Sequence, residues 1–217
     1  MEKGILIAFE GISACGKSTQ INYISKYLND NEYKFTKTSW NSDEVISPLI
    51  GQAKKNKLFT PITWSILHAT DFSRRYFEEI LPALEENRVV LADRYYPTAY
   101  TRDTYRGIPA NYVQNLYSFA RKPDIIFFLD LPPEKSIERR LKRHPNLYYY
   151  SSGNDVNPLL GLQPSFMKYQ NNLYSNYREL KEVCNFSWID ATQEPDKIYQ
   201  DILLELEPLL SRCVKQG

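Results

Sequence analysis

The sequence predicts a three-layer α/β fold, with a parallel sheet of five strands covered by helices on both faces. Two observations carry this prediction. Short apolar runs without polar alternation suit strands that are buried on both faces. Segments with helical spacing separate these runs, and strands that alternate with helices are typical of a parallel sheet. The length of 217 residues predicts a single domain over 1–217.

The strands are predicted from continuous apolar runs. Four runs are clear: Gly4 to Phe9, Val89 to Ala92, Ile125 to Leu131 and Phe186 to Ile189. A weaker fifth strand is predicted over Lys34 to Trp40. Their lengths suit strands rather than helices.

The helices are predicted from apolar spacing and from proline at helix starts. They cover Lys17 to Leu28, Pro61 to Leu84, Pro132 to Arg143, Gln163 to Lys181 and Pro195 to Leu210. Proline removes a backbone donor and clashes with the preceding turn, so Pro208 should kink or end the last helix.

Composition and charge exclude several classes of function. The net charge is +1, with 24% charged and 42% hydrophobic residues, so there is no global basic field for a nucleic acid polymer or a membrane surface. No apolar run approaches the roughly 20 residues of a membrane span, and no leader segment is expected. Cys15, Cys184 and Cys213 form no CxxC pair and no metal pattern with His68 and His144, which favours a reducing, cytoplasmic setting.

A phosphate-binding loop is the most specific motif. Residues 11–18 read GISACGKS, which matches G-x-x-x-x-G-K-[ST] between a strand and a helix. Gly11 and Gly16 let the backbone curl so that several N–H groups face one anion. Lys17 should reach the β- and γ-phosphates of ATP, and the Ser18 hydroxyl should bind Mg²⁺. Cys15 occupies a variable position and is interpreted as a small residue. The fold is therefore expected to be that of the P-loop NTPases.

A second polar site follows the strand at Val89. Residues 89–96 read VVLADRYY, and ligands of open α/β sheets bind beyond the carboxyl ends of the strands. Asp93 is a candidate Mg²⁺ ligand through water, and Arg94 a candidate bidentate clamp for an acceptor phosphate. The alternative is a buried structural pair between Asp93 and Arg94.

A lid is predicted over residues 139–162. The stretch from His144 to Leu162 is rich in Gly, Asn, Pro and Ser and holds Tyr148 to Tyr150. Long loops of this kind are often active-site lids. Basic residues precede it: Arg139, Arg140, Lys142 and Arg143. We interpret Arg140 and Arg143 as catalytic cations; the alternative is an ordinary surface loop after a solvated helix end.

Together these motifs resemble the thymidylate kinase family of P-loop nucleotide kinases. The segments that carry the resemblance are FEGISACGKSTQ, ADRYYPTAYTRD, KPDIIFFLDLPPEKSIERRLKR and WIDATQEPDKIYQDI, which together span most of the chain. The stretches HATDFSRRY and TSWN look closer to archaeal members than to bacterial ones.

The resemblance implies ATP and Mg²⁺ as cofactors and dTMP as the acceptor. Around the nucleotide it implies Gly11, Ser13, Ala14, Cys15, Gly16, Lys17, Ser18 and Thr19. Around the acceptor it implies Glu10, Trp40, His68, Phe72, Arg94, Thr98, Arg102 and Asp103, with Arg94 on the phosphate and Thr98, Arg102 and Asp103 near the base or sugar. It also implies a homodimer, through the helix over Pro61 to Leu84.

Simpler interpretations remain open for the helix residues. His68, Phe72 and Arg75 share one helix face by spacing. Phe72 or His68 would offer a face to thymine in the family arrangement, whereas Phe72 is alternatively a core residue. Asp71 and Arg75 are alternatively an i, i+4 ion pair.

Three residues depart from the family pattern. The acidic residue of the family's loop, associated with the acceptor's 3′-hydroxyl and the metal's water shell, is Ser13 here. Phe72 stands where many members carry an arginine toward the pyrimidine, and Trp40-Asn41 replaces the bacterial arginine–glutamate–proline run. These departures leave open the preference for the base.

The acceptor decides which catalytic groups are needed. A nucleoside hydroxyl must lose a proton to a placed base, whereas a monophosphate oxygen is already anionic and needs cations and alignment. The chain supplies Lys17, Arg94 and the basic lid, which favours phosphorylation of dTMP to dTDP. Glu10 leaves a deoxynucleoside kinase as an alternative, and Ser13 leaves a non-catalytic nucleotide-binding paralogue as another.

Overall fold

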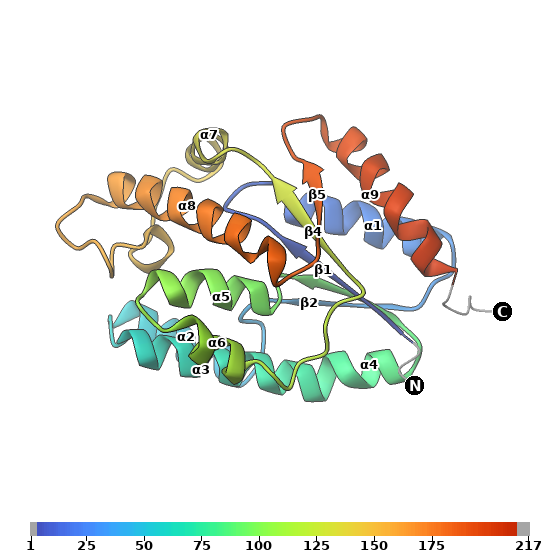
Figure 1. Cartoon of the computed structure of the whole chain (residues 1–217), viewed down its shortest axis with the longest axis horizontal. Helices are drawn as coiled ribbons and strands as arrows, with labels where there is room; N and C mark the ends of the chain where they lie inside the picture. Colours follow the sequence, from blue (N-terminus) through green and yellow to red (C-terminus); the bar gives the residue numbers. More distant parts are fainter. Residues whose placement is uncertain (1–3, 212–217) are drawn as a thin grey trace.

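The computed structural model describes residues 4–211, apart from the side chain of Glu182. A five-stranded parallel sheet in the order β2-β3-β1-β4-β5 forms the middle layer (Figure 1). The strands are β1 (Ile5–Glu10), β2 (Phe35–Ser39), β3 (Val89–Asp93), β4 (Ile125–Asp130) and β5 (Phe186–Asp190). Each begins and ends within one residue of its predicted bounds. The predicted sheet is confirmed.

Helices cover both faces of the sheet. They are α1 (Lys17–Asp30), α2 (Ile46–Lys55), α3 (Pro61–Arg75), α4 (Leu81–Glu85), α5 (Tyr96–Tyr105), α6 (Ala110–Leu116), α7 (Pro133–Arg143), α8 (Leu162–Glu179) and α9 (Pro195–Leu210). Three short helical segments join them: η1 (Tyr76–Ile80), η2 (Tyr150–Ser152) and η3 (Leu180–Glu182). This is the predicted three-layer P-loop NTPase fold, with no helix in the described part of the chain long and apolar enough to cross a membrane.

Alternate residues of the central strand β1 enter two separate cores. Ile5, Ile7 and Phe9 pack with the apolar faces of α1 and α9. Leu6 and Ala8 pack on the opposite side, against α3, η1, α4, α5, α6 and α8. Every residue of β1 is buried, because both sides of the strand are covered. This burial explains why the apolar run in the sequence does not alternate.

The helix predicted over 61–84 forms with an interruption. Pro61 is its first residue, and the Thr60 hydroxyl accepts from the Thr63 N–H at 3.1 Å, which caps α3. The helix widens to a π-helical stretch at η1, immediately before Pro82 in α4. Proline has no N–H and its ring clashes with the carbonyl four residues back, which explains a local change in helical pitch there. Pro208, by contrast, lies inside the last turn of α9, which ends two residues later at Leu210.

Three helices were not predicted from the sequence: α2, α5 and α6. All are short, and α5 is rich in β-branched and aromatic residues that have weak helix propensity. Both α2 and α5 border the cavity described below. Cys15 and Cys184 are buried thiols outside any disulfide, and Cys213 lies outside the described residues.

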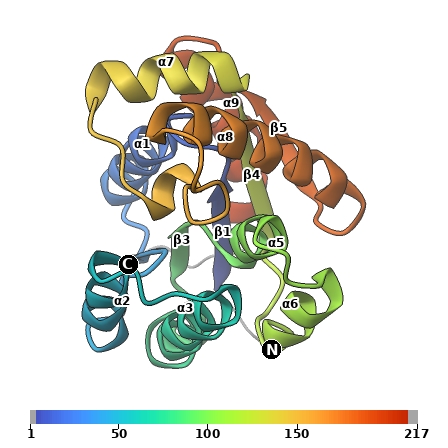
Figure 2. The same ribbon diagram turned by 90° about the vertical axis from the view of Figure 1, so that its left-hand side faces the viewer.

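The carboxyl ends of the strands bring the predicted site residues to one edge. In the register, Phe9 lies opposite Asp93, and Ser39 of β2 lies opposite the same Asp93. Glu10 and Arg94 therefore emerge from neighbouring strands. Viewed from this end, α7 and α8 lie above the sheet edge and α2 and α3 below it (Figure 2).

Candidate active site

The loop after β1 has the backbone shape that anion binding requires. Gly11, Ala14 and Gly16 have φ angles of 138°, 53° and 106°, all in the left-handed range. A Cβ at Gly11 would lie 2.7 Å from Cys15 Sγ and 2.9 Å from the Leu129 carbonyl oxygen, so glycine is required there by space as well as by conformation. No side chain caps the start of α1, which leaves its first N–H groups directed toward a ligand.

Lys17 is buried beneath this loop. Its Nζ donates to the carbonyl oxygens of Ile12 at 3.1 Å and Gly11 at 3.3 Å, and to Cys15 Sγ at 3.4 Å. Burial, and then the nearby positive charge of Arg94, lower the pKa of the ammonium group. A phosphate anion beside Lys17 would offset both effects.

Ser13 connects the phosphate-binding loop to α7 and α8. Its N–H donates to Gln170 Oε1 at 2.9 Å, and its carbonyl oxygen accepts from Ser136 Oγ at 2.6 Å. The loop is thus tied to α7 and α8. Gln170 and Ser136 were not singled out in the sequence, because no local motif indicates that these helices reach the loop.

Asp93 and Ser18 form an oxygen pair at the mouth of the loop. The Ser18 hydroxyl donates to Asp93 Oδ2 at 3.2 Å. A hydroxyl and a carboxylate are hard ligands of the kind that Mg²⁺ prefers. The two side chains therefore fit the predicted metal site. Asp93 is only half-buried and, among the described residues, forms no ion pair with Arg94, which argues against the buried pair that the sequence left as an alternative.

Glu10 is the centre of a buried hydrogen-bond network. Its Oε1 accepts from the Tyr95 N–H at 2.8 Å, and its Oε2 accepts from Thr98 Oγ1 at 2.8 Å and Tyr177 OH at 2.7 Å. Arg94 Nη1 lies 3.8 Å from Oε2. Glu10 is 0% exposed. A carboxylate so placed orients Arg94 and Thr98 and is poorly located to accept a proton from a substrate.

Arg94 is fixed at the end of β3 in an unusual backbone conformation. Its φ of 76° costs a non-glycine residue about 1–3 kcal/mol. Nη1 donates to Thr98 Oγ1 at 3.2 Å and to Tyr177 OH at 3.4 Å. Burial alone would lower the pKa of Arg94, but Tyr177 and Glu10 raise it, so the guanidinium stays charged. Tyr177 of α8 was missed in the sequence, where nothing local marks it.

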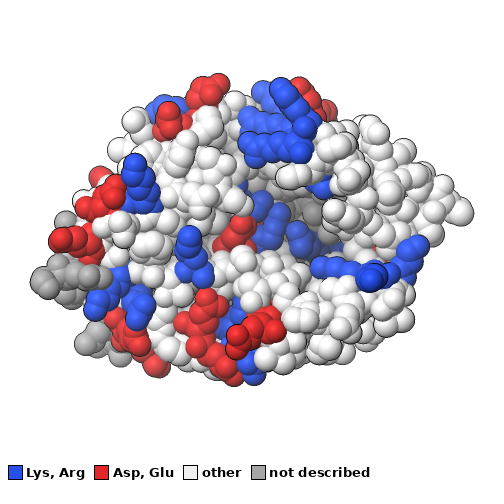
Figure 3. All heavy atoms as spheres, turned by 180° about the vertical axis from the view of Figure 1, so that it is seen from behind, with Lys and Arg blue, Asp and Glu red and all other residues white. Residues whose placement is uncertain are grey.

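Arg94 opens into a cavity of about 720 Å³ between the loop, α2, α5, α8 and the segment after α7. Among the described residues, six cationic side chains and no carboxylate line it: Lys54, Lys55, Lys57, Arg94, Arg102 and Arg140. Tyr148, Tyr149 and Tyr150 close one side. The hollow of the face in Figure 3 is bordered by lysine and arginine side chains. The cavity is therefore suited to an anionic ligand.

The predicted lid divides into an exposed part and an anchored part. Arg140 contacts the cavity and donates to the carbonyl oxygens of His144 and Asn146, whereas Arg143 is exposed and does not line the cavity. Tyr150 is buried, and its hydroxyl accepts from the Phe59 N–H at 3.3 Å. Asp155 pairs with Arg106 at 2.7 Å. These contacts tie residues 150–155 to the body of the protein.

Three side chains predicted around the acceptor, Trp40, His68 and Phe72, lie in an aromatic cluster. We define this aromatic cluster as Trp40, Phe59, Trp64, His68, Phe72 and Tyr117, which contact one another through their rings. Phe72 is 0% exposed and belongs to the main core, which is the alternative that the sequence left open. Asp71 and Arg75 form the alternative ion pair at 2.9 Å.

His68 and Asp103 are also enclosed. His68 is 1% exposed, and its Nδ1 donates to the Trp64 carbonyl oxygen at 2.7 Å. Burial, then the charge of Lys54, lower its pKa well below the usual value, so the ring is neutral. Asp103 accepts from Ser65 Oγ at 2.7 Å, and burial raises its pKa to about 6. Neither residue lines the cavity, whereas Trp64, whose ring centre lies 4.1 Å from that of His68, does line it.

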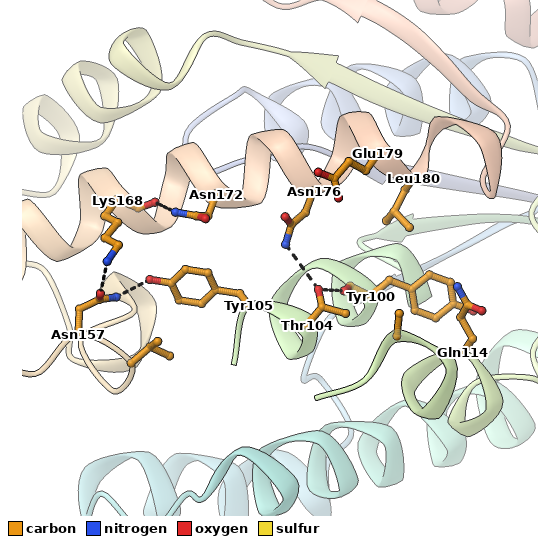
Figure 4. Close-up of a pocket in the computed structure, with 12 residues that line it drawn as sticks. Tyr100, Thr104, Tyr105, Gln114, Asn157, Lys168, Asn172, Asn176, Glu179 and Leu180 are labelled. Carbon is orange, nitrogen blue, oxygen red and sulfur yellow. Dashed lines mark hydrogen bonds between the residues drawn. The ribbon is translucent and has the colours of Figure 1, made fainter. Parts of the chain in front are cut away.

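A second cavity of about 530 Å³ lies between α5, α6 and α8 (Figure 4). Its polar side chains bond to one another: Asn157 Nδ2 donates to Tyr105 OH at 2.6 Å, and Lys168 Nζ donates to Asn157 Oδ1 at 2.8 Å. None of the predicted site residues lines this cavity. Its contacts tie the segment after η2 to α5 and α8 rather than forming part of the phosphate site.

Comparison with known proteins agrees with this site. The sequence model of the thymidylate kinase family matches residues 9–202. The chain is 39% identical to "Probable thymidylate kinase 2" of Saccharolobus solfataricus over 213 residues, which cover 98% of each chain. It is 29% identical to "Thymidylate kinase" of Thermoanaerobacter sp. strain X514 over 209 residues, which cover 93% of this chain and 96% of the relative. The chain belongs to the thymidylate kinase family.

Proposed function

We propose that this kinase transfers the γ-phosphoryl group of ATP to dTMP, giving ADP and dTDP. The observation that carries the proposal is the shared sheet edge, where Ser13 of the phosphate-binding loop and Arg94 border one cavity that is lined by cations and, among the described residues, by no carboxylate. An acceptor monophosphate needs charge compensation and alignment rather than a base, and this edge supplies both. The names of the relatives support dTMP as the acceptor.

The residues of the candidate site have the following roles in this proposal. Residues 11–19 hold the ATP phosphates through backbone N–H groups, with Lys17 at the β- and γ-phosphates. Arg94 holds the acceptor phosphate in a position fixed by Glu10, Thr98 and Tyr177. Arg140 contributes positive charge from the lid side.

Mg²⁺ is proposed at the Ser18 and Asp93 oxygens. The ion would supply charge neutralisation of the ATP phosphates, as it does in other phosphoryl-transfer sites. Within the described residues no group of three or more His, Cys, Asp or Glu side chains lies together. A site of two protein oxygens leaves the remaining ligands to phosphates and water, which is the usual arrangement for Mg²⁺.

The deoxynucleoside kinase is the second candidate, and Glu10 was its proposed base. The buried, fully bonded Glu10 weakens this candidate, since a base must reach the attacking hydroxyl. A coupled assay of ADP release with a panel of nucleoside monophosphates and nucleosides separates the two. Turnover of nucleosides alone would exclude dTMP phosphorylation, and ATP binding without turnover on any acceptor would indicate a non-catalytic paralogue.

A homodimer is proposed through the outer face of α2, α3 and η1. Leu49, Ile62, Ile66 and Phe77 expose between 45% and 52% of their surface on these neighbouring elements. An apolar face of this kind often marks an interface. Light scattering of the chain and of an Ile66→Glu variant tests it, and an unchanged monomeric mass for both would contradict it. A cytoplasmic location and a single domain with a lid over 139–162 remain predictions.

A further inference from the structure

Two partly buried cations of the cavity, Arg102 and Lys54, have no counter-charge among the described residues. Arg102 of α5 is half-buried, its Nε is buried without a hydrogen-bond partner, and within the described residues it forms no ion pair. Lys54 of α2 lies with its Nζ 5.3 Å from the centre of the Trp64 ring and likewise forms no ion pair there. Both side chains border the same cavity as Arg94.

The other cations near them are either exposed to water or already compensated. Lys55 and Lys57 are exposed, and Arg140 donates to two carbonyl oxygens. Arg94 Nη1 is used by Thr98 and Tyr177, and Glu10 lies 3.8 Å away. Arg106 is paired with Asp155 at 2.7 Å. Asp103 is engaged by Ser65 and does not contact the cavity. Among the partly buried cations of the cavity, Arg102 and Lys54 are therefore the two whose charge is offset by neither a carboxylate nor a carbonyl oxygen of the described residues, and they come from different helices.

Bringing like charges together in a partly buried site is unfavourable unless a ligand balances them. The crowding of positive charge affects both groups: burial, and then Arg94, lower the pKa of Arg102, while burial, and then Arg102, bring the pKa of Lys54 to about 8. A sugar or a neutral pyrimidine ring would leave this repulsion in place. A phosphate dianion would remove it and would satisfy the buried Arg102 Nε.

We propose that Arg102 and Lys54, together with Arg94, hold the phosphate group of the acceptor nucleotide, so that Arg102 does not contact the base or sugar as the family resemblance implied. The proposal rests on the proposed function. It is reinforced by the end of β2, where Ser39, Trp40, Asn41 and Ser42 supply no cation to the same cavity.

The decisive experiment compares dTMP with thymidine, which lacks the phosphate. Dissociation constants are measured for both ligands with the full chain, Arg102→Gln and Arg102→Lys, using calorimetry or competition. Loss of one charge-assisted hydrogen bond should raise the dissociation constant of dTMP by about 10- to 100-fold. The dissociation constant of thymidine should change by less than about threefold. Arg102→Lys should retain part of the dTMP affinity because the charge remains.

The controls separate this inference from the proposed function. Arg88→Gln, at the opposite end of β3, should leave the affinities of both ligands unchanged. An unchanged ATP affinity shows that each variant is folded. If wild-type protein neither binds nor phosphorylates dTMP, the proposed function fails. If wild-type protein does both, the phosphate role of Arg102 is tested by the variant. That role is wrong if Arg102→Gln lowers the affinities for dTMP and thymidine equally, or lowers neither affinity.

The role of Lys54 has its own readout in pH dependence. The charged groups facing it are Arg102 and Arg106 of α5 and Asp71 of α3, with the neutral ring of His68 beside them. A bound dianion raises the pKa of Lys54 above about 8, so binding takes up a proton and the affinity for dTMP falls between about pH 8 and 9.5.

Lys54→Gln should weaken dTMP at pH 7 by about 10-fold and remove this decline, whereas Lys26→Gln on the exposed side of α1 should preserve it. The measurement is the dTMP dissociation constant across pH, with proton uptake from calorimetry in two buffers. An unaltered pH profile in Lys54→Gln would remove Lys54 from the phosphate site.

Discussion

The phosphate edge and the aromatic cluster lie side by side and are built in opposite ways. At the phosphate edge, charged side chains are held by hydrogen bonds around a cavity, as in the network of Glu10, Arg94 and Tyr177. In the aromatic cluster, rings fill the space, and Phe72 and His68 are almost without exposed surface. From this difference we predict that the phosphates meet a pre-formed site, whereas His68 and Phe72, which the family resemblance placed near the base, serve packing.

The largest effect is expected at the phosphate edge, from Lys17→Ala. Removing a cation that meets the transferring phosphoryl group should lower kcat about 10²- to 10³-fold, because such groups act mainly through electrostatic stabilisation. Lys26→Ala, on the exposed face of α1, should stay within about twofold of wild type. Steady-state kinetics with dTMP measures both. A loss below tenfold for Lys17→Ala, with ATP bound, would break the assignment of this loop as the catalytic phosphate site.

The aromatic cluster should respond in stability rather than in catalysis. Phe72→Ala removes a fully buried ring and should cost about 3–5 kcal/mol of unfolding free energy, with the KM for dTMP changed by less than about threefold. Leu204→Ala is the control, because Leu204 is 71% exposed on α9 and should cost less than about 0.5 kcal/mol. Urea unfolding measures the change in stability, and steady-state kinetics measures the KM for dTMP. A KM that rises tenfold with unchanged stability would show that Phe72 contacts the acceptor.

The two regions also differ in how far the sequence predicts them. The bend of the phosphate-binding loop depends on glycines and a lysine at fixed spacing, so local sequence is sufficient for Gly11, Gly16 and Lys17. Tyr177 contacts Glu10 across 167 residues, and Lys54 reaches the cavity from a helix that was not predicted. Such positions follow from the packing of helices around the sheet, which periodicity does not specify. Phe72 shows the converse: helical spacing placed it on the correct face, but that face is core.

A smaller effect on kcat/KM is expected from Ser13→Asp, which tests whether Ser13 leaves the acceptor without a hydrogen bond that the family's carboxylate would make. Ser13→Asp restores the carboxylate that the family carries in this loop, and a charged hydrogen bond is worth about 1.5–3 kcal/mol. We expect the kcat/KM for dTMP to rise by about 10-fold or more. Ser13→Asn, which has similar volume without the charge, is the matched control. If kcat/KM for dTMP does not rise in Ser13→Asp, Ser13 is not the reason for any low activity on dTMP.

The smallest effect is expected from Asp103, at the border between the two regions. Burial raises its pKa to about 6, above the unfolded value, so the folded state binds the proton more tightly. This contribution to stability is complete below about pH 4 and is lost as pH rises through 6. Asp103→Asn should abolish that loss, which amounts to about 3 kcal/mol in full and to about 2 kcal/mol between pH 4.5 and 7.5. The test is to measure the unfolding free energies of wild type and variant from pH 4.5 to 7.5. Parallel curves would mean that Asp103 is charged throughout this range. The border of the aromatic cluster would then accept a buried carboxylate as readily as the phosphate edge accepts Glu10.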